Sequence, residues 1–452
     1  MSGSPRWVAY DVLRAVHDSD AYANLLLPRA ITRAGLTGPD AGLATELTYG
    51  TLRREGTYDA IIADAARRPV ADIDPAVRDA LLLGVHQLLA MRTPAHAAVN
   101  ETVRQVRKAV GASAAGFANA VLRRVSERTP DEWDERLAAG ARSDDERLAL
   151  RYAHPVWVIR AFRRALAAEG RADELEALLA ADNAAPVVTL AALPGLAHRP
   201  ADAAPTPYSP LGFRSAGGDP GALVAASEGL VRVQDEGSQL AALALSRALP
   251  VAPGERWLDL CAAPGGKTAV LAAEALAHGA ELEANELSPA RAPLVRDSVA
   301  AVPLEVPVSE EDGRTRAARG RYDRILVDAP CTGLGALRRR PEARWRKQPA
   351  DVPELAALQT ELLDAAIAAL RPGGIVAYVT CSPHLAETAA VVADALRSHG
   401  DTIEEIDARA VVAGISDAPI DLAAPADGSG RAQLWPHRHG TDAMSISLLR
   451  KR

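Results

Sequence analysis

Strand-like and helical segments alternate from about residue 231 to the end of this 452-residue chain. The strand-like runs are apolar, and in chain order they lie at 256–260, 281–284, 325–327 and 375–379. Helical patterns follow them at 268–271, 289–300, 353–370 and 385–398. This alternation predicts a doubly wound α/β sheet, in which ligands bind beyond the carboxyl ends of the strands. The residues that carry chemistry should therefore stand directly after strands.

The residues before this region have a different character. Apolar positions recur at helical spacing from residue 6 to about 138, with helix breaks at 35–39 and 93–94. A strand-like run at 187–190 precedes a Pro-, Ala- and Gly-rich stretch at 193–221, for which we expect a loop or a poorly ordered insertion. At this length we expect several domains, namely an all-α domain at 1–139, a small α+β connector at 140–230 and an α/β domain at 231–452.

The bulk composition limits the compartment. Three cysteines are too few, and odd in number, for a disulfide framework, which favours a reducing cytoplasm. The first residues contain no apolar signal region, and no later segment is a charge-free run long enough for a bilayer. The net charge of −7 argues against a general binder of polyanions, although a local basic patch would suffice for nucleic acid. We expect a cytoplasmic monomer with no membrane partner.

A glycine turn joins the predicted strand at 256–260 to the helix after it. The turn is not a phosphate-binding P-loop, because Cys261 occupies the position where that loop needs glycine. Small residues in a turn let the backbone approach a ligand closely, and the N–H groups at a helix N-terminus donate hydrogen bonds to a carboxylate. We therefore expect a cofactor to be bound by Cys261, Ala262, Ala263, Pro264, Gly265, Gly266 and Lys267.

Two acidic residues follow at the ends of later strands. Glu286 lies about twenty residues past the glycine turn, where a carboxylate suits the two hydroxyls of a ribose. Asp312 lies near a third strand end, within reach of an adenine amine. Either acid alone would more often be a solvated loop residue. Together, and without a basic cradle for phosphates, they favour S-adenosylmethionine over a nucleotide.

Cysteines follow the two remaining strands. Cys331 stands in Asp328-Ala329-Pro330-Cys331, and Cys381 stands in Thr380-Cys381-Ser382. A single cysteine is usually a buried structural residue, but both of these lie in sharp turns at the edge where the ligand should bind. Two thiols and the Asp328 carboxylate there suggest covalent chemistry. A metal site is not expected, because no histidine stands at ligand spacing to either cysteine.

Two clusters of basic residues are candidates for contact with nucleic acid. The first lies on one face of a predicted helix and the second follows Cys331, with Trp345 interleaved. Each could equally be a solvated charged face, but the second adjoins the proposed site and carries an aromatic ring. The candidate contacts to an RNA backbone are Arg104, Arg107 and Lys108, and then Arg338, Arg339, Arg340, Arg344, Arg346 and Lys347.

Taken together, the motifs resemble the bacterial 16S rRNA cytosine-C5 methyltransferase B family, also called RsmB, Fmu or Sun, within the NOL1/NOP2/sun group. The segments at 116–124, 148–155 and 233–239 also resemble parts of that family. The resemblance implies an all-α NusB-like RNA-binding domain, a small α+β connector and a C-terminal Rossmann-like class I methyltransferase domain that depends on S-adenosylmethionine.

The resemblance also implies roles for the site residues. The Thr-Cys-Ser cysteine, Cys381, would be the nucleophile, and Cys331 would assist product release. The 261–267 turn would bind the cofactor, with Glu286, Asp312 and Asp328 as its acidic contacts. The expected reaction is methyl transfer to C5 of a cytosine in RNA, with 16S rRNA as the expected substrate, through a covalent bond from cysteine to C6. The alternatives are the same chemistry on another RNA such as tRNA, or a non-catalytic RNA-binding or ribosome-assembly factor.

Overall fold

The computed structural model describes residues 3–19, 21–215, 217 and 220–452, which form two compact units. The first unit consists of the described parts of Met1–Arg160, Glu176–Ala185 and Leu337–Arg346. The second consists of Ala161–Leu175, Pro186–Ala336 and Lys347–Arg452, again within the described residues. The division into three domains at 139 and 230 stays a prediction. In the described part of the chain, no helix is both long and apolar enough to cross a bilayer.

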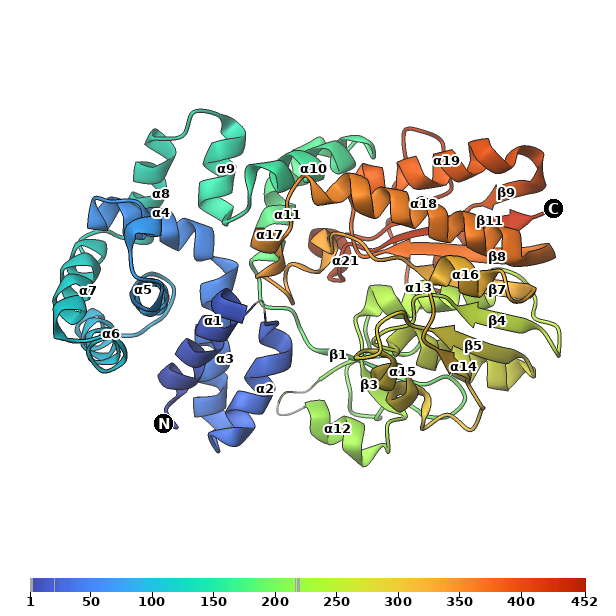
Figure 1. The fold of residues 1–452 in the computed structure, drawn as a ribbon, viewed down its shortest axis with the longest axis horizontal. Helices are drawn as coiled ribbons and strands as arrows, with labels where there is room; N and C mark the ends of the chain where they lie inside the picture. Colours follow the sequence, from blue (N-terminus) through green and yellow to red (C-terminus); the bar gives the residue numbers. More distant parts are fainter. Residues whose placement is uncertain (1–2, 20, 216, 218–219) are drawn as a thin grey trace. The chain divides into compact units, whose positions relative to one another are not determined.

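The first unit is built from helices, as the periodicity predicts (Figure 1). The expected breaks are confirmed, because one helix ends at Arg33 and the next begins at Gly38, and another break separates Leu89 from Ala95. The helices are α1 (Pro5–Ser19), α2 (Ala23–Arg33), α3 (Gly38–Arg53), α4 (Glu55–Ala66), α5 (Pro75–Leu89), α6 (Ala95–Ala109), α7 (Ala112–Val125), α8 (Pro130–Ala139) and α9 (Asp144–Tyr152), with a 3-10 turn η1 at Val70–Asp72. Their apolar faces form one buried core.

Local signals explain where two of these helices begin. Asp74 caps α5, since its carboxylate accepts the backbone N–H of Ala76 at 2.8 Å, and Pro75 occupies the first helical position. Thr129 and Glu132 cap α8 reciprocally, with each side chain accepting the backbone N–H of the other residue. These caps satisfy amides that have no partner within the helix.

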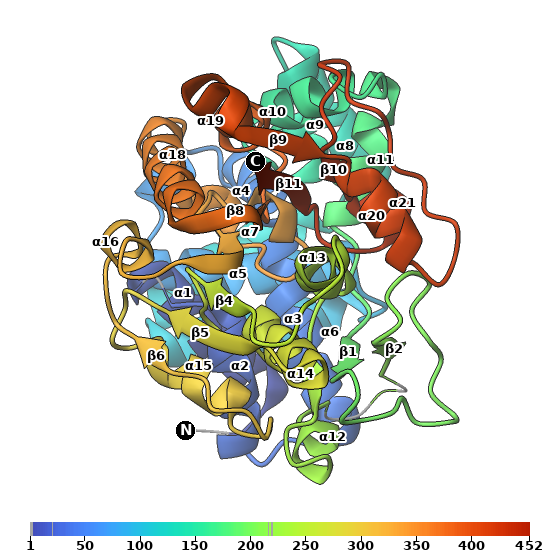
Figure 2. The same cartoon turned by 90° about the vertical axis from the view of Figure 1, so that its right-hand side faces the viewer.

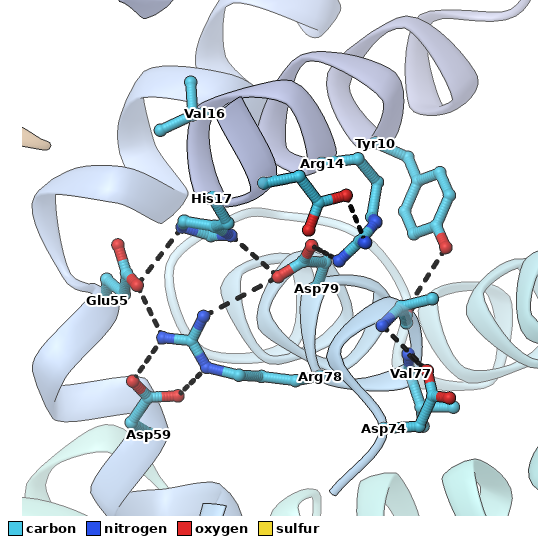
Figure 3. A network of polar contacts seen from close by, with 12 residues as sticks. Tyr10, Arg14, Val16, His17, Glu55, Asp59, Asp74, Val77, Arg78 and Asp79 are labelled. Carbon is cyan, nitrogen blue, oxygen red and sulfur yellow. Dashed lines mark hydrogen bonds and ion pairs between the residues drawn. The ribbon is translucent and has the colours of Figure 1, made fainter. Parts of the chain in front are cut away.

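A network of charged side chains joins α1, α4 and α5 inside the first unit (Figure 3). His17 contacts Asp79 through Nδ1 at 2.8 Å and Glu55 through Nε2 at 3.2 Å. Arg78 donates to the same Glu55 oxygen at 2.5 Å, and Arg14 donates to Asp79 at 2.8 Å. Asp79 and Glu55 are buried, so their charges need these partners.

The imidazole of His17 is held protonated by this network. Burial alone would lower the pKa of His17, but hydrogen bonds to Asp79 and Glu55 outweigh burial and raise it to about 9. The ordinary value of 6.5 applies in the unfolded chain. The stabilisation is therefore fully present below pH 6.5 and is lost as the pH rises through about 9.

We expect His17→Gln to lower the stability of α1 and α5 at pH 6.5 by on the order of 3 kcal/mol, with the difference from wild type disappearing above pH 9. Hydrogen exchange of peptides from the two helices, corrected for intrinsic rates, measures this. The control is His399→Gln, which removes a half-buried histidine paired with Asp364 in the second unit. Equal destabilisation of the His17 variant at both pH values would contradict a role for the charged imidazole.

Part of the second basic cluster lies in the interior of the first unit, which corrects an expectation. Arg344 lies in a short helix, α17 (Ala343–Arg346), and is fully buried. Its guanidinium donates to the carbonyls of Arg53 at 2.9 Å and Ala153 at 3.0 Å, and to Asn183 Oδ1 at 2.9 Å. Arg338 is also buried. Because the Arg344 guanidinium is enclosed by carbonyls and Arg338 is buried, the structure does not support the assignment of these two residues to RNA contact.

Trp345 and Arg346 are also used within the first unit. A Cβ atom on Gly56 in α4 would lie 2.4 Å from the Trp345 ring, so the indole packs where that glycine leaves space. Arg346 donates to the carbonyls of Val16 at 3.0 Å and Ala21 at 2.6 Å. Base stacking by Trp345 and backbone contact by Arg346 are therefore not supported. Arg339 and Arg340 are exposed and Lys347 is half-buried.

Further helices and a small antiparallel sheet lie along the chain between α9 and the large sheet of the second unit. The helices are α10 (Val156–Ala167), α11 (Leu175–Asp182) and α12 (Pro220–Ala226), with η2 at Ala172–Glu174. A three-stranded antiparallel sheet has the order β2-β1-β3, from Gly212–Arg214, Thr189–Ala192 and Val231–Val233. The loop predicted at 193–221 is thus wrong for Gly212–Arg214, whose Phe213 is buried. Residues 216, 218 and 219 of that stretch lie outside the described residues.

The second unit centres on a large mixed sheet. Its strands are β4 (Arg256–Asp259), β5 (Glu281–Asn285), β6 (Val308–Ser309), β7 (Tyr322–Asp328), β8 (Leu370–Thr380), β9 (Ile403–Ile406), β10 (Ala432–Gln433) and β11 (Ser445–Lys451). They lie in the order β10-β11-β8-β7-β4-β5-β6, with β9 also pairing β11. Pairing is parallel from β8 to β6, and β11 runs antiparallel to β8. The chain winds outward in both directions from β4 and β7, which makes a topological switch point between them.

Helices cover both faces of this sheet, as the predicted α/β rhythm requires. They are α13 (Glu236–Arg247), α14 (Gly266–His278), α15 (Ala292–Val299), α16 (Gly313–Ala317), α18 (Asp351–Ala369), α19 (Ala389–His399), α20 (Ala408–Ile415) and α21 (Pro436–His439), with 3-10 turns η3 (Leu334–Ala336), η4 (Leu385–Glu387) and η5 (Gly400–Thr402). Figure 2 shows α13 and α14 on one side and α18 on the other. Successive strand residues face opposite cores, so Trp257 packs with α13 and α14 while Leu258 packs with α18.

Candidate active site

The candidate site lies where the carboxyl ends of β4, β7 and β8 meet. The three strands are parallel neighbours, with Asp259 opposite Leu326 and Asp328 opposite Val379. The glycine turn, the Cys331 turn and the Cys381 turn leave the sheet at this edge. The structure therefore brings together the three motifs that the sequence places directly after strands, at the switch point where ligands of such folds bind.

The glycine turn is held tightly against α15. Gly265 has φ +100°, and a Cβ atom there would lie 2.4 Å from the Cβ of Ser298, so only glycine fits. Gly265 also immediately precedes α14, whose first amides point toward the site edge. Thr268 in that helix donates to Asp259 Oδ2 at 2.7 Å. The turn therefore has the close backbone approach that a bound cofactor needs.

Asp259 is a buried carboxyl with an unused oxygen. Its side chain is 1% exposed, and burial raises its pKa to about 7, opposed in part by the hydrogen bond from Thr268. Oδ1 has no hydrogen-bond partner of ordinary geometry among the described residues, although the backbone N–H of Cys261 is near enough to the carboxyl to act against the rise of its pKa. Such an orphaned acceptor beside the glycine turn fits a ligand that carries a positively charged amine, as S-adenosylmethionine does.

The two predicted cofactor acids have different surroundings. Glu286 is buried at the end of β5 and accepts the backbone N–H groups of Ala263 at 3.2 Å and Ser288 at 3.0 Å. This ties the carboxylate to the glycine turn, and the ribose contact by Glu286 stays a prediction. Asp312 caps α16 and pairs with Arg314, which holds the pKa of Asp312 below its ordinary value. The adenine contact by Asp312 stays a prediction.

The two thiols of the candidate site are adjacent. Cys331 Sγ and Cys381 Sγ are 3.5 Å apart, and both residues are half-buried and free. Either thiol can donate in this contact. With Cys331 as the donor, the hydrogen bond lowers the pKa of Cys381 and, together with burial, raises the pKa of Cys331 well above its usual range. The pair is thus ordered, with Cys381 as the thiol that ionises first. The third cysteine, Cys261, is different, because burial raises its pKa strongly.

Lys267 lies at the centre of the site rather than only in the glycine turn. Its ammonium donates to Asp328 Oδ2 at 2.7 Å. Burial alone would lower the pKa of Lys267, but the charges of Asp328 and Cys381 raise it above its ordinary value. Lys267 in turn favours the thiolate of Cys381. The sequence placed Lys267 only among the cofactor contacts, because spacing along the chain does not show which side chain points across β7.

A further buried acid was not predicted from the sequence. Glu387 in η4 is fully buried and accepts hydrogen bonds from Thr332 and Ser382, the residues that follow the two cysteines. The available signal was the hydroxyl residue directly after each cysteine, which needs a partner when buried. The described residues contain no group of three or more His, Cys, Asp or Glu side chains arranged to hold a metal ion.

The first basic cluster lies on the surface of the first unit. Arg104, Arg107 and Lys108 of α6 are exposed, as the helical spacing predicts. Arg104 pairs with Glu101, and Lys108 Nζ lies 5.0 Å from the centre of the Trp7 ring. All three residues are exposed, and their contact with an RNA backbone stays a prediction.

Known families match both parts of the chain. Residues 4–127 match the NusB family, and residues 246–450 match the family described as 16S rRNA methyltransferase RsmB/F. A Mycobacterium tuberculosis H37Rv protein provisionally named a methyltransferase is 49% identical, covering 99% of this chain and 96% of that protein. Ribosomal RNA small subunit methyltransferase B of Pseudomonas putida KT2440 is 36% identical, covering 86% of this chain and 88% of that protein.

Solved structures share the fold. The crystal structure of PH0851 has a TM-score of 0.80 at 22% identity, covering 100% of this chain and 99% of that one. A methyltransferase homologue from Pyrococcus horikoshii has a TM-score of 0.53 at 23% identity, covering 68% of this chain and 98% of that one.

Fold and family together define an RNA methyltransferase with a NusB-like helical domain and a Rossmann-like methyltransferase domain. The chain belongs to the 16S rRNA methyltransferase RsmB/F family. The family and the fold support S-adenosylmethionine as its cofactor, which agrees with the acids and the glycine turn at the site.

We expect Lys267→Met to raise the pKa of the Cys381 thiol, because the variant removes the ammonium that favours the thiolate. The pH dependence of iodoacetamide alkylation, assigned to each cysteine by mass spectrometry, measures the change. Alkylation of Cys381 at pH 7 should therefore slow in the variant, because a smaller fraction of the thiol is ionised. The control is Lys108→Ala on the surface of the first unit, which should leave the alkylation profile unchanged. An unchanged profile in the Lys267 variant would exclude its influence on Cys381.

Proposed function

We propose that this chain transfers a methyl group from S-adenosylmethionine to C5 of a cytosine in RNA, and that the RNA is 16S rRNA. The observation that carries the proposal is the pair of thiols 3.5 Å apart beside the Lys267–Asp328 ion pair. One thiol is made acidic and the other is held protonated, so the pair suits a reaction with separate nucleophilic and proton-transfer steps. The substrate assignment is supported by the name of the Pseudomonas putida relative.

Cysteine addition makes the cytosine reactive. C5 of cytosine is a poor nucleophile, so the Cys381 thiolate attacks C6, forming an S–C6 bond and moving the electron pair of the C5–C6 double bond toward C5. Asp328 hydrogen-bonds the N3 side of the ring. This bond stabilises the adduct when Asp328 is protonated, or when a bridging group carries a proton between Asp328 and N3. Lys267, bonded to Asp328, places a positive charge where electron density increases. Bound S-adenosylmethionine supplies the methyl group from its sulfonium.

Release requires the C5 proton to leave. Loss of that proton restores the C5–C6 double bond and expels the Cys381 thiolate. Cys331 lies next to Cys381, where the protonated thiol can orient the base for this step, and it can act as the base itself only after giving up its own proton. The target base must first leave its stack, which is least costly for a nucleotide in a loop.

We expect Cys381→Ser to abolish methyl transfer and to leave S-adenosylmethionine binding within twofold of wild type. The hydroxyl is not ionised at neutral pH, so no C6 adduct forms, while the cofactor contacts stay in place. Isothermal titration with S-adenosylmethionine and transfer of a radioactive methyl group to RNA measure the two properties. Residual transfer above 1% of wild type would argue against Cys381 as the nucleophile.

The matching variant, Cys331→Ala, should accumulate a covalent protein–RNA adduct. Addition at C6 and methyl transfer proceed, but elimination is slowed because the release thiol is missing. The adduct survives denaturing electrophoresis and is detected as a band of lower mobility that carries labelled RNA. An adduct in the Cys381 variant, and none in the Cys331 variant, would mean that the two roles are exchanged.

The RNA substrate separates the remaining alternatives. If the chemistry acts on another RNA such as tRNA, bisulfite sequencing of total RNA from a deletion strain would show that a 5-methylcytosine is lost from that RNA. The 5-methylcytosine signals of 16S rRNA would then be unchanged. If the chain is instead a non-catalytic RNA-binding or ribosome-assembly factor, titration would show no affinity for S-adenosylmethionine. The paired thiols of different acidity favour the catalytic function.

We expect the exposed face of α6 to contribute to RNA affinity through phosphate contacts. Replacing Arg104 and Arg107 by alanine should weaken binding and reduce the slope of log K against log salt by about 1 for each lost contact. Arg397→Ala is a matched control, because Arg397 is 73% exposed and Arg104 is 75% exposed, and each pairs with an acid three residues earlier. A slope equal to that of wild type would show that the exposed face of α6 does not contact RNA phosphates.

A further inference from the structure

One buried carboxylate holds both cysteine turns. Glu387 is fully buried, and its Oε2 accepts the hydroxyls of Thr332 and Ser382, each at 2.6 Å. Its Oε1 accepts the backbone N–H of Thr332 at 2.7 Å and the amide of Gln359 at 3.2 Å. A carboxylate with this many donors is charge-stabilised without a cationic partner. Glu387, Thr332, Ser382 and Gln359 therefore form one hydrogen-bonded cluster rather than an ion pair, and we call this cluster the polar joint.

The partners of Glu387 show that this cluster connects the two cysteine turns. Thr332 directly follows Cys331, and Ser382 directly follows Cys381. Both hydroxyls meet the same carboxylate oxygen, so the two turns are fixed to each other one residue away from their thiols. The distance of 3.5 Å between the thiols is a consequence of this shared anchor as well as of the pairing of β7 with β8.

Two neighbouring groups make the anchor rigid. Gln359 of α18 donates both to Glu387 and to the carbonyl of Pro330 at 2.8 Å, which binds the start of the Cys331 turn. The Tyr378 hydroxyl in β8 donates to the backbone carbonyl of Glu387 at 2.7 Å. Both side chains are buried, so water does not compete for these bonds.

We propose that Glu387 is a positioning residue that sets the spacing of the two thiols for the proposed reaction. This inference rests on the proposed function, because the spacing matters only if one thiol adds to the base and the other assists its release. Glu387 also acts electrostatically. After the hydrogen bond to Cys381 and burial, its charge is a further cause that raises the pKa of Cys331, and so it helps to keep the two thiols different.

The spacing of the thiols can be measured without RNA or cofactor. Phenylarsine oxide bonds two neighbouring thiols, forming two As–S bonds, while the As–O bond breaks and the two thiol protons leave with the oxygen as water. We expect one arsenical to bridge Cys331 and Cys381 in wild type, and Cys331→Ala and Cys381→Ser each to abolish the bridge. Glu387→Gln should weaken bridging by about tenfold, the effect of losing one hydrogen bond to a charged group.

The same variant should lose turnover while it keeps its cofactor. Misplacement of reacting groups by about 1 Å lowers rates by about 100-fold, so we expect kcat of Glu387→Gln to fall by about 100-fold. The KM for S-adenosylmethionine should stay within twofold of wild type. Thr332→Ser keeps the hydroxyl and should retain near-normal activity, whereas Thr332→Val should behave like the Glu387 variant. This rescue separates positioning from simple loss of packing.

A matched control accounts for loss of stability. Glu274→Gln also neutralises a buried glutamate of the second unit, one that is bonded to Ser246 and Arg247 rather than to the cysteine turns. In Glu274→Gln, phenylarsine oxide should bridge Cys331 and Cys381 as in wild type, and kcat should equal the wild-type value. Wild-type bridging and turnover in Glu387→Gln would overturn the positioning role. Weakened bridging in that variant, with no cytosine methylation by wild type on any RNA, would uphold the spacing role and refute the proposed function instead.

Discussion

The parallel pairing of β4, β7 and β8 is the constraint on which the candidate site depends. Each strand ends in a short turn that bears chemistry, and parallel alignment brings the three turns to one edge of the sheet. Without that alignment Lys267 could not reach Asp328, and Cys331 could not lie beside Cys381. The polar joint at Glu387 then fixes distances that strand pairing alone leaves adjustable.

The site uses electrostatics to make two chemically identical groups different. The Lys267 ammonium lowers the pKa of Cys381 and the Glu387 carboxylate raises the pKa of Cys331, and the hydrogen bond between the two thiols widens this difference when Cys331 is its donor. Acidic side chains lie near both thiols, so the difference between the two pKa values arises from the arrangement of their neighbours rather than from the overall charge of the site. A pair of this kind can hold one proton and one negative charge at the same time, which a nucleophile and a proton-transfer group require.

Much of the fold follows from local pattern, because strands of the second unit are apolar runs bounded by turn residues, as at 325–327 and 375–379. Motif spacing also located Cys331, Cys381 and the glycine turn. Long-range packing could not be predicted in the same way. Arg344 belongs to a basic run that is typical of a solvated or RNA-binding face, yet its guanidinium is enclosed by carbonyls from distant segments. The hydroxyl residues after the two cysteines signal a buried partner, but local pattern does not show that this partner is Glu387, which is 55 residues from Thr332.

The central claim is methylation at C5 of a cytosine in 16S rRNA, and the most direct test uses S-adenosylmethionine that carries a deuterated methyl group. The protein is incubated with 16S rRNA, the RNA is digested to nucleosides, and the products are analysed by mass spectrometry. The account predicts labelled 5-methylcytidine that maps to one position and is absent with the Cys381→Ser variant. Label on another base, or on a ribose, or labelled 5-methylcytidine formed equally by the variant, would contradict it.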